Sequence, residues 1–302
     1  MSSAAPEPRT RQPGADLRLL VPLRPQGPIE VIDRATHLLR TRAADFLTIS
    51  LGVQIPIWLI LALVLRDEWA GGVNDNIAWF WLALFPHPVT LGLLLDRAGD
   101  ASTFGILLSR ALPSFGLAVV GGACGVLVHD WSLGRATRGG EALLRVARRL
   151  HVLLAMWAII HVLQLVTCIG VALGPLVFGI AAPLWGMEGL GAWSGVVRSW
   201  RLSFRRFWPL LLSIPIATLV SGLTGGLLGA IGVPILISLT GGWVDAGGTA
   251  ATALAGALPH LVLDPLLATA MALIALDLKV QAEGYDLEVE LAEAEQSARV
   301  DG

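Results

Sequence analysis

Long apolar runs alternate with polar segments along most of the chain, and their lengths indicate membrane-spanning helices. A transmembrane helix needs about 17–25 predominantly apolar residues, and seven runs reach this length. They cover residues 47–65, 77–95, 105–128, 150–169, 171–187, 209–237 and 251–276. The pattern predicts an all-α, polytopic transmembrane helical bundle, because each helix satisfies its own backbone hydrogen bonds within lipid.

Segment 77–95 differs from the other six runs because Pro86, His87 and Pro88 lie in its middle. Two prolines at this depth would remove backbone hydrogen bonds that lipid cannot replace. We therefore expect 77–95 to be a re-entrant or interfacial element on the outer face. The remaining runs predict six spans.

The positions of the basic residues set the expected orientation. With six spans and a cytoplasmic N-terminus, 18 of the 21 Lys and Arg residues lie inside, and only Arg66, Arg97 and Arg110 lie outside. A seventh span at 77–95 would leave 9 inside and 12 outside. Because basic residues concentrate on the cytoplasmic side, both termini are predicted to be cytoplasmic.

The two ends of the chain differ in composition from its apolar middle. Residues 1–28 are rich in Pro, Ala, Gln and Arg, which predicts a disordered cytoplasmic arm. Residues 29–280 form the predicted six-span membrane domain, and residues 281–302 form an acidic cytoplasmic tail. The first long apolar run starts too far along the chain for a cleavable signal peptide.

Composition agrees with a membrane protein and excludes several other classes. Hydrophobic residues make up 55% of the chain and charged residues 15%, with a mean hydropathy of +0.70. A soluble domain averages about 25% charged residues. The net charge of −2 gives no reason to expect a nucleic-acid partner. Cys124 and Cys168 lie in apolar runs without metal-ligand spacing, and the common catalytic motifs are absent. We therefore expect no enzymatic activity, no metal and no cofactor.

Two segments beside predicted spans are amphipathic. Residues 29–46 begin after Pro28, which favours the first turn of a helix. Residues 193–208 interleave aromatic side chains with arginines beside an apolar run, a pattern typical of a membrane surface. The segment predicts either simple anchoring or recognition of lipid headgroups. Its candidate interfacial residues are Arg198, Arg201, Arg205, Arg206, Trp200 and Trp208.

Small residues recur at every fourth position of the run 209–237. They are Ser213, Ala217, Ser221, Gly225 and Gly229. Small side chains let helix backbones approach closely in lipid, so the stripe predicts a helix-packing surface. Its partner is either another helix of the same chain or a second molecule. Residues 118–125 carry a similar pattern.

Of the 44 charged residues, only Asp264 lies well inside a predicted span. His260 precedes it by four residues and shares its helix face, while His161 and Gln54 are polar groups in other spans. Ionisable residues within a membrane mark functional sites by default. One interpretation is a proton-linked or substrate-binding site formed by His161, His260 and Asp264. The other is a structural pair of Asp264 with His260 that satisfies groups freed by neighbouring prolines.

Four stretches carry a resemblance to a known family. They are 27–40 (GPIEVIDRATHLLR), the hairpin with Gly and Pro in its turn within 150–187, 196–211 (VVRSWRLSFRRFWPLL) and 273–292 (LIALDLKVQAEGYDLEVELA). The sequence resembles the mainly actinobacterial six-span membrane proteins related to the membrane domain of glycerophosphoryl diester phosphodiesterases. The resemblance implies a six-span fold but not the phosphodiesterase activity, because the chain has no room for that catalytic barrel. Asp264 departs from the family pattern, which has an apolar residue there.

These patterns together predict a non-enzymatic protein of the bacterial inner membrane. It would serve as a scaffold, an accessory or a lipid-interacting component of an envelope-related assembly. Its expected partners are membrane lipids and, through packing surfaces, other membrane proteins or a second copy of the chain. The alternative function is a small-molecule or lipid transporter that uses the polar groups inside the membrane.

Overall fold

The structure, a computed structural model, describes residues 20–64, 103–166, 178–239 and 249–291, together with residue 294. Within these ranges every regular element is a helix and there is no strand, which confirms the predicted all-α class. The predicted element 77–95 and the expected turn near residue 170 lie outside the described residues.

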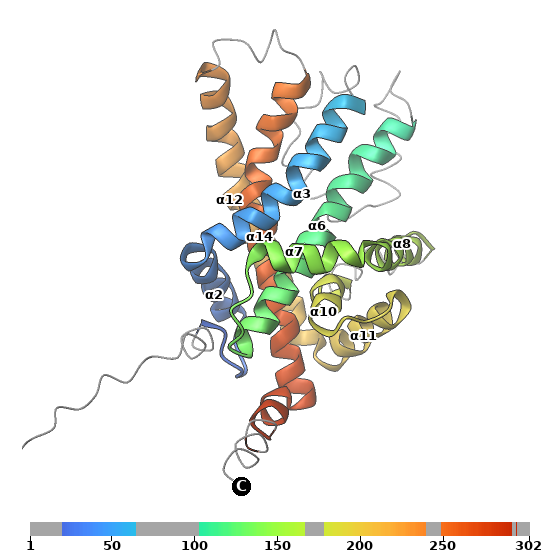
Figure 1. Cartoon of the computed structure of the whole chain (residues 1–302), viewed down its shortest axis with the longest axis vertical. Coiled ribbons are helices and arrows are strands. Elements are labelled where there is room, and N and C mark those ends of the chain that lie inside the picture. The colour runs from blue at the N-terminus through green and yellow to red at the C-terminus, as the bar shows by residue number, and fades with distance from the viewer. Residues whose placement is uncertain (1–19, 65–102, 167–177, 240–248, 292–293, 295–302) are drawn as a thin grey trace, which may run out of the picture.

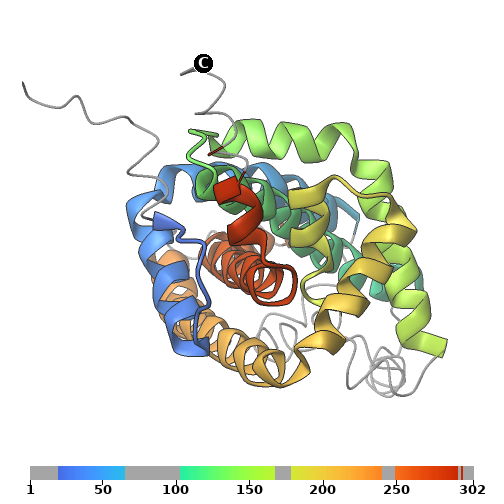
Figure 2. The same cartoon turned by 90° about the horizontal axis from the view of Figure 1, so that it is seen from below.

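Four long helices run roughly along the long axis of the molecule (Figure 1). They are α3 (Ala43–Val64), α6 (Thr103–Ser132), α12 (Phe207–Leu239) and α14 (Thr249–Glu283). Of these, α14 is central: 89% of its most apolar stretch is buried, and Figure 2 shows the other helices around it. Small buried side chains such as Ala268, Ala272 and Ala275 allow its neighbours to approach closely.

Three stretches among the described residues are long and apolar enough to cross a membrane. They are Ala43–Ile60, Ala111–Ser132 and His260–Glu283. A fourth crossing is added if α7 (Gly139–Arg148) and α8 (Leu150–Val166), which meet at a bend of 74°, form one broken span. The structure therefore has three or four candidate crossings, consistent with a membrane protein, and does not confirm six.

Other helices lie across the long axis, among them α7 and α8, which cross it at about mid-height in Figure 1. Figure 2 shows α7 and α8 lengthwise while α14 is seen nearly end-on. The helix α10 (Ala181–Glu188) has only 8 residues, or about 12 Å of length, which is too short to cross about 30 Å of hydrocarbon. The structure does not confirm the predicted spans 150–169 and 171–187, parts of which lie outside the described residues. An all-apolar segment has no pattern that distinguishes a spanning helix from one packed flat against others.

Residues 20–27 pack against the bundle. Val21 is only 1% exposed, and the Gln26 backbone N–H donates a hydrogen bond of 2.7 Å to the Asp277 carboxylate on α14. The prediction of a disordered arm is therefore wrong for these residues, because Val21 is buried against the bundle and the Gln26 backbone finds an acceptor on a helix distant in the sequence. The next helix, α2 (Pro28–Thr41), starts at Pro28 as predicted.

The helices α6 and α10 approach each other through glycines. A Cβ atom on Gly125 would lie 2.2 Å from the carbonyl oxygen of Pro183, and one on Gly186 would lie 2.1 Å from that of Gly122. Real Cβ atoms do not come this close to backbone. The small-residue pattern predicted for residues 118–125 is thus a close helix contact, with α10 as its partner.

The small-residue stripe of α12 is described in part. Ser213 is 6% and Ala217 is 2% exposed, so at these two positions the packing is intramolecular. The side chains of Ser221, Gly225 and Gly229 lie outside the described set. A second stripe on α12 is apolar and exposed, as expected of a surface that faces lipid. It comprises Leu212, Leu219, Leu223, Leu227, Ile231 and Ile235.

Candidate functional site

Asp264 lies in a hydrogen-bonded cluster between α14 and α3, and we call this group, with Gln54, Trp58 and His260, the intramembrane cluster. The Gln54 amide donates to one Asp264 oxygen, and His260 Nδ1 lies 3.1 Å from the other. Trp58 Nε1 donates to the Gln54 carbonyl oxygen at 3.1 Å. The predicted pairing of His260 with Asp264 is confirmed, and Gln54 joins them. With Asp264 only 3% exposed and both its oxygens accepting, the arrangement favours the structural interpretation.

His161 belongs to a separate contact. On α8, its Nε2 atom lies 3.3 Å from the Ser114 hydroxyl oxygen and its Nδ1 atom 2.9 Å from the Trp157 carbonyl oxygen. Trp157 Nε1 also donates to Ser114 at 3.1 Å. Within the described chain these are the hydrogen bonds of His161, so the expected three-residue site is not assembled. The four-residue spacing of His260 and Asp264 predicted their contact. No such spacing shows which helix lies against α8, so the partners of His161 could not be predicted.

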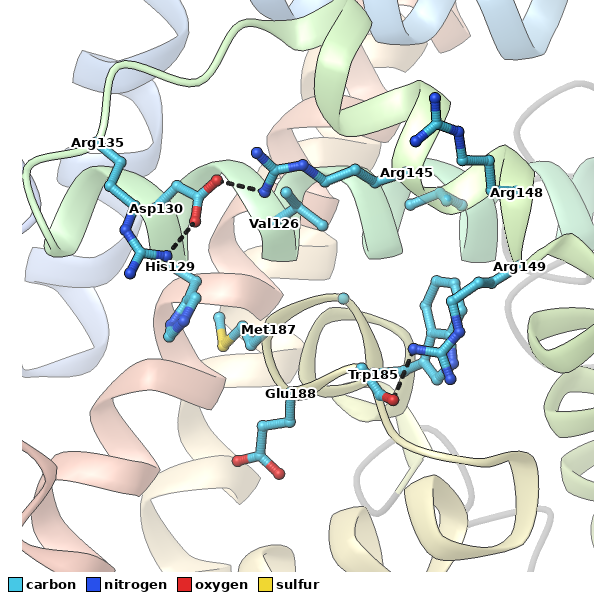
Figure 3. Close-up of a pocket in the computed structure, with 13 residues that line it drawn as sticks. Val126, His129, Asp130, Arg135, Arg145, Arg148, Arg149, Trp185, Met187 and Glu188 are labelled. Carbon is cyan, nitrogen blue, oxygen red and sulfur yellow. Dashed lines mark hydrogen bonds and ion pairs between the residues drawn. The ribbon is translucent and has the colours of Figure 1, made fainter.

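A cavity of about 530 Å³ opens between α6, α7 and α10 (Figure 3). We call it the arginine cavity. Its charged lining consists of four arginines and two carboxylates, namely Arg135, Arg145, Arg148, Arg149, Asp130 and Glu188. Arg145, Arg148 and Arg149 are exposed, so the cavity is open to the surface.

At one side of the arginine cavity, the Asp130 carboxylate is paired with two arginines and a hydroxyl group. Arg145 approaches it to 2.7 Å and Arg135 to 3.7 Å, and the Thr137 hydroxyl donates at 2.5 Å. Because Asp130 is only 2% exposed, these partners compensate its desolvation. This carboxylate therefore holds the chain between α6 and α7 in place.

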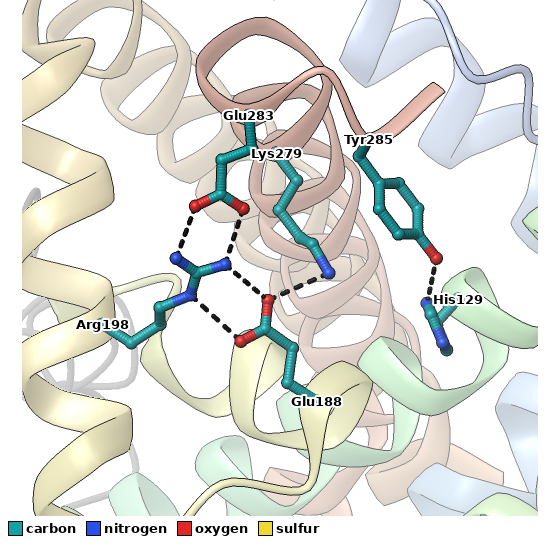
Figure 4. A network of polar contacts seen from close by, with 6 residues as sticks. All are labelled: His129, Glu188, Arg198, Lys279, Glu283 and Tyr285. Carbon is teal, nitrogen blue, oxygen red and sulfur yellow. Dashed lines mark hydrogen bonds and ion pairs between the residues drawn. The ribbon is translucent and has the colours of Figure 1, made fainter. Parts of the chain in front are cut away.

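Glu188 is the centre of a second charge network (Figure 4). It accepts two hydrogen bonds of 3.0 Å from Arg198 on α11 (Ala192–Arg205). Lys279 on α14 lies 2.9 Å from Glu188, and Arg198 also donates to both oxygens of Glu283, one at 2.6 Å. The network ties α10, α11 and α14 together.

The charged groups of this network shift one another's pKa values. Burial alone would raise the pKa of Glu188, but the hydrogen bonds from Arg198 and Lys279 outweigh it and hold that pKa below its usual range. The same carboxylates, Glu188 first and then Glu283, raise the pKa of Arg198. Burial raises the pKa of Tyr285, whose ring lies 4.3 Å from the Lys279 amine. All these groups are paired, which is the state expected of a structural network.

This network corrects the interpretation of Arg198 as a lipid-facing residue, because two carboxylates occupy its guanidinium. Arg206 also turns inward in part and donates to the Gln281 carbonyl at 3.2 Å. Arg201 and Arg205 are exposed, as predicted. The spacing of the aromatic residues identified the amphipathic helix. Carboxylates on α10 and α14, however, determine which of its arginines are paired and which are exposed.

The outer face of α11 and the start of α12 present large aromatic side chains to the surroundings. We call this surface the aromatic face, formed by Trp193, Trp200, Phe204 and Trp208, which are 62%, 49%, 48% and 74% exposed. Trp200 and Phe204 have ring centroids 4.6 Å apart. In water such a patch is unfavourable, whereas Trp is enriched at membrane interfaces.

The arginine cavity was missed from the sequence, where the arginines in 129–149 were used only to orient the chain. One signal was present: α7 is amphipathic, with Ala142 and Val146 buried and Arg145 and Arg148 exposed. The cavity itself depends on α10 packing against α6, which no local pattern predicts.

Comparisons of the chain with protein-family models, with curated proteins and with solved structures find no match. The family resemblance seen in the sequence therefore stays a prediction. Among the described residues, no group of three or more His, Cys, Asp or Glu side chains is arranged to hold a metal ion. The charged and aromatic surfaces at the end of the bundle are the features on which a function can be argued.

Proposed function

We propose that this chain is a non-enzymatic, multi-pass protein of the bacterial inner membrane that binds anionic lipid at the cytoplasmic leaflet. In this role it acts as a scaffold or accessory component of an envelope-related assembly. The observation that carries the proposal is the aromatic face, which is exposed beside Arg201 and Arg205 at the end of an apolar helical bundle.

The proposal includes six spans with both termini cytoplasmic. It is supported by a contact that joins the two ends of the described chain, in which the Gln26 backbone bonds to Asp277 near the end of α14. Segments before the first long helix and after the last one thus lie at the same end, which we call the basic end. An even number of crossings produces this arrangement.

The physics of the aromatic face fits binding to an anionic membrane surface. Trp and Phe side chains partition into the headgroup region, where their apolar rings leave water and the Trp N–H keeps a polar partner. Each basic residue near the surface contributes about 1 kcal/mol of attraction to anionic lipid. Arg201 and Arg205 would supply this attraction directly beside Trp200 and Phe204.

The intramembrane cluster gives less support to the alternative of a transporter. A transporter of this kind needs a hydrated path to its polar groups, whereas Asp264 is 3% exposed and hydrogen-bonded on both oxygens. Removing Gln54 or His260 would leave one oxygen of the buried Asp264 carboxylate without a hydrogen-bond partner, which is unfavourable. The cluster is therefore explained by the packing of α3 on α14.

Neutralising the exposed arginines of α11 should weaken lipid binding. In the double variant Arg201→Gln/Arg205→Gln, loss of about 2 kcal/mol of attraction should reduce retention of phosphatidylglycerol roughly 30-fold. Native mass spectrometry of protein extracted from mixed phosphatidylglycerol and phosphatidylcholine nanodiscs measures this retention. A matched control is Arg40→Gln/Arg138→Gln, which removes the same net charge from exposed positions outside α11. Equal loss in the two variants would show that α11 does not carry the binding.

A further inference from the structure

The arginine cavity holds more positive charge than its own carboxylates compensate. Asp130 is paired with Arg135 and Arg145, and Glu188 is paired with Arg198 and Lys279 from outside the cavity lining. Neither carboxylate is within ion-pair distance of Arg148 or Arg149. Figure 3 shows these two arginines on the side of the cavity away from Asp130.

Arg149 is held in place without being neutralised. Its guanidinium donates to the carbonyl oxygens of Gly189 at 2.6 Å and Leu190 at 3.2 Å and lies 5.7 Å from the centre of the Trp185 ring. Gly189 has a φ of +63°, and a Cβ there would lie 2.9 Å from Arg149 Nη1. The glycine thus makes room for a guanidinium that keeps its full charge and has further N–H groups to donate.

A second group at the cavity lacks a partner. The Trp185 indole lines the cavity, and its Nε1–H is buried without a hydrogen-bond acceptor in the part of the chain that the structure describes. A buried donor without an acceptor destabilises the fold. Arg148 likewise has no hydrogen bond or ion pair to any described residue. An anion in the cavity would give acceptor oxygens to the donors gathered here.

We propose that the arginine cavity binds a phosphate monoester, with Arg148 and Arg149 as its principal charge partners. A monoester carries close to two negative charges at neutral pH and three terminal oxygens that accept bidentate hydrogen bonds from guanidinium groups. The volume of about 530 Å³ exceeds that of a bare phosphate and suits one bearing a small polar substituent. The ligand is either a soluble phosphate ester or the headgroup of phosphatidic acid, which share this chemistry.

The inference deepens the proposed lipid binding by adding a second, chemically selective site, and its test separates the two. In one arm, inorganic phosphate is titrated calorimetrically into the purified full-length protein in detergent. In the other arm, native mass spectrometry compares retention of phosphatidic acid, a monoester, with that of phosphatidylglycerol, a diester. We expect monoester binding in at least one arm: phosphate binding identifies a soluble ligand, and selective retention of phosphatidic acid identifies a lipid.

The variant Arg148→Gln should weaken monoester binding roughly tenfold, and Arg148→Gln/Arg149→Gln roughly 100-fold, because each loses a charge-assisted interaction. Arg148 is exposed and has no described partner, so its substitution leaves the fold intact. Arg40→Gln/Arg138→Gln is the matched control, because it removes the same net charge from exposed positions outside both the arginine cavity and the aromatic face, and it should leave monoester binding unchanged. The proposal is overturned if inorganic phosphate does not bind and phosphatidic acid is retained no better than phosphatidylglycerol, or if the control variant loses as much monoester binding as the arginine variants. Those outcomes leave phosphatidylglycerol binding by the aromatic face unaffected.

Discussion

Replacing Gly125 with alanine is expected to destabilise the protein by about 3 kcal/mol or more, the upper end of the range for overpacking. The added Cβ would meet the Pro183 carbonyl oxygen at 2.2 Å, with the Pro183 Cα and C atoms at 2.8 and 2.9 Å. All three are backbone atoms, so no side-chain rotation relieves the contact. The helices α6 and α10 would have to separate, and the Glu188 network at the end of α10 would be strained with them.

Gly121→Ala is the matched control for this prediction, because it adds the same methyl group to the same helix. Its Cβ would meet its nearest neighbour, the Ala182 side chain, at 3.4 Å, an ordinary van der Waals contact. Thermal unfolding of both variants in detergent measures the difference. If Gly125→Ala unfolds at the same temperature as Gly121→Ala, the close approach of α6 and α10 is wrong.

Replacing Glu188 with glutamine is the second change with a large expected effect, also about 3 kcal/mol. It leaves Lys279, whose side chain is 7% exposed, as a buried amine without its carboxylate. Arg198 would retain only Glu283, and the link from α10 to the other two helices would be lost. Glu283→Gln is the control: Arg198 and Lys279 both keep Glu188, so the loss of stability should be smaller. Equal destabilisation would mean that Glu188 is not the centre of the network.

The Glu188 network also predicts a dependence on pH. Because the pKa of Glu188 is lower in the folded protein than in the unfolded chain, its stabilisation is fully present above the unfolded value of about 4.3. It is lost as the pH falls through the lower folded pKa. The stability difference between the native protein and Glu188→Gln should therefore shrink on acidification below about pH 4.3. A difference that grows on acidification would contradict the lowered pKa.

The sequence predicted features that depend on composition or local spacing. Apolar run lengths predicted the long helices, and the four-residue spacing of His260 and Asp264 predicted their contact, because helix geometry alone brings such residues together. The partner of Asp264 on α3 is different: Gln54 lies 210 positions away in the chain, so only the packed fold identifies it.

Three further features also depend on the packed fold and could not be predicted from local sequence. They are the orientation of α8, the inward turn of Arg198 and the arginine cavity. An evenly apolar helix carries no information about which face it buries, so its direction is set by the surfaces that it meets. Arg198 and Arg201 look equivalent in the sequence, but only Arg198 has Glu188 and Glu283 within reach. Sites formed between helices that are distant in the sequence require the three-dimensional arrangement.

Cysteine labelling in intact cells tests most directly whether the basic end of this bundle faces the cytoplasm. In a background with Cys124 and Cys168 replaced by alanine, one variant carries Leu287→Cys, at a position 65% exposed beyond α14. The other carries Ala98→Cys beside Arg97, which the sequence predicts outside. A membrane-impermeant maleimide should label the cysteine at 98 in intact spheroplasts and the cysteine at 287 only after permeabilisation. Labelling at 287 in intact spheroplasts would contradict cytoplasmic lipid binding by the aromatic face.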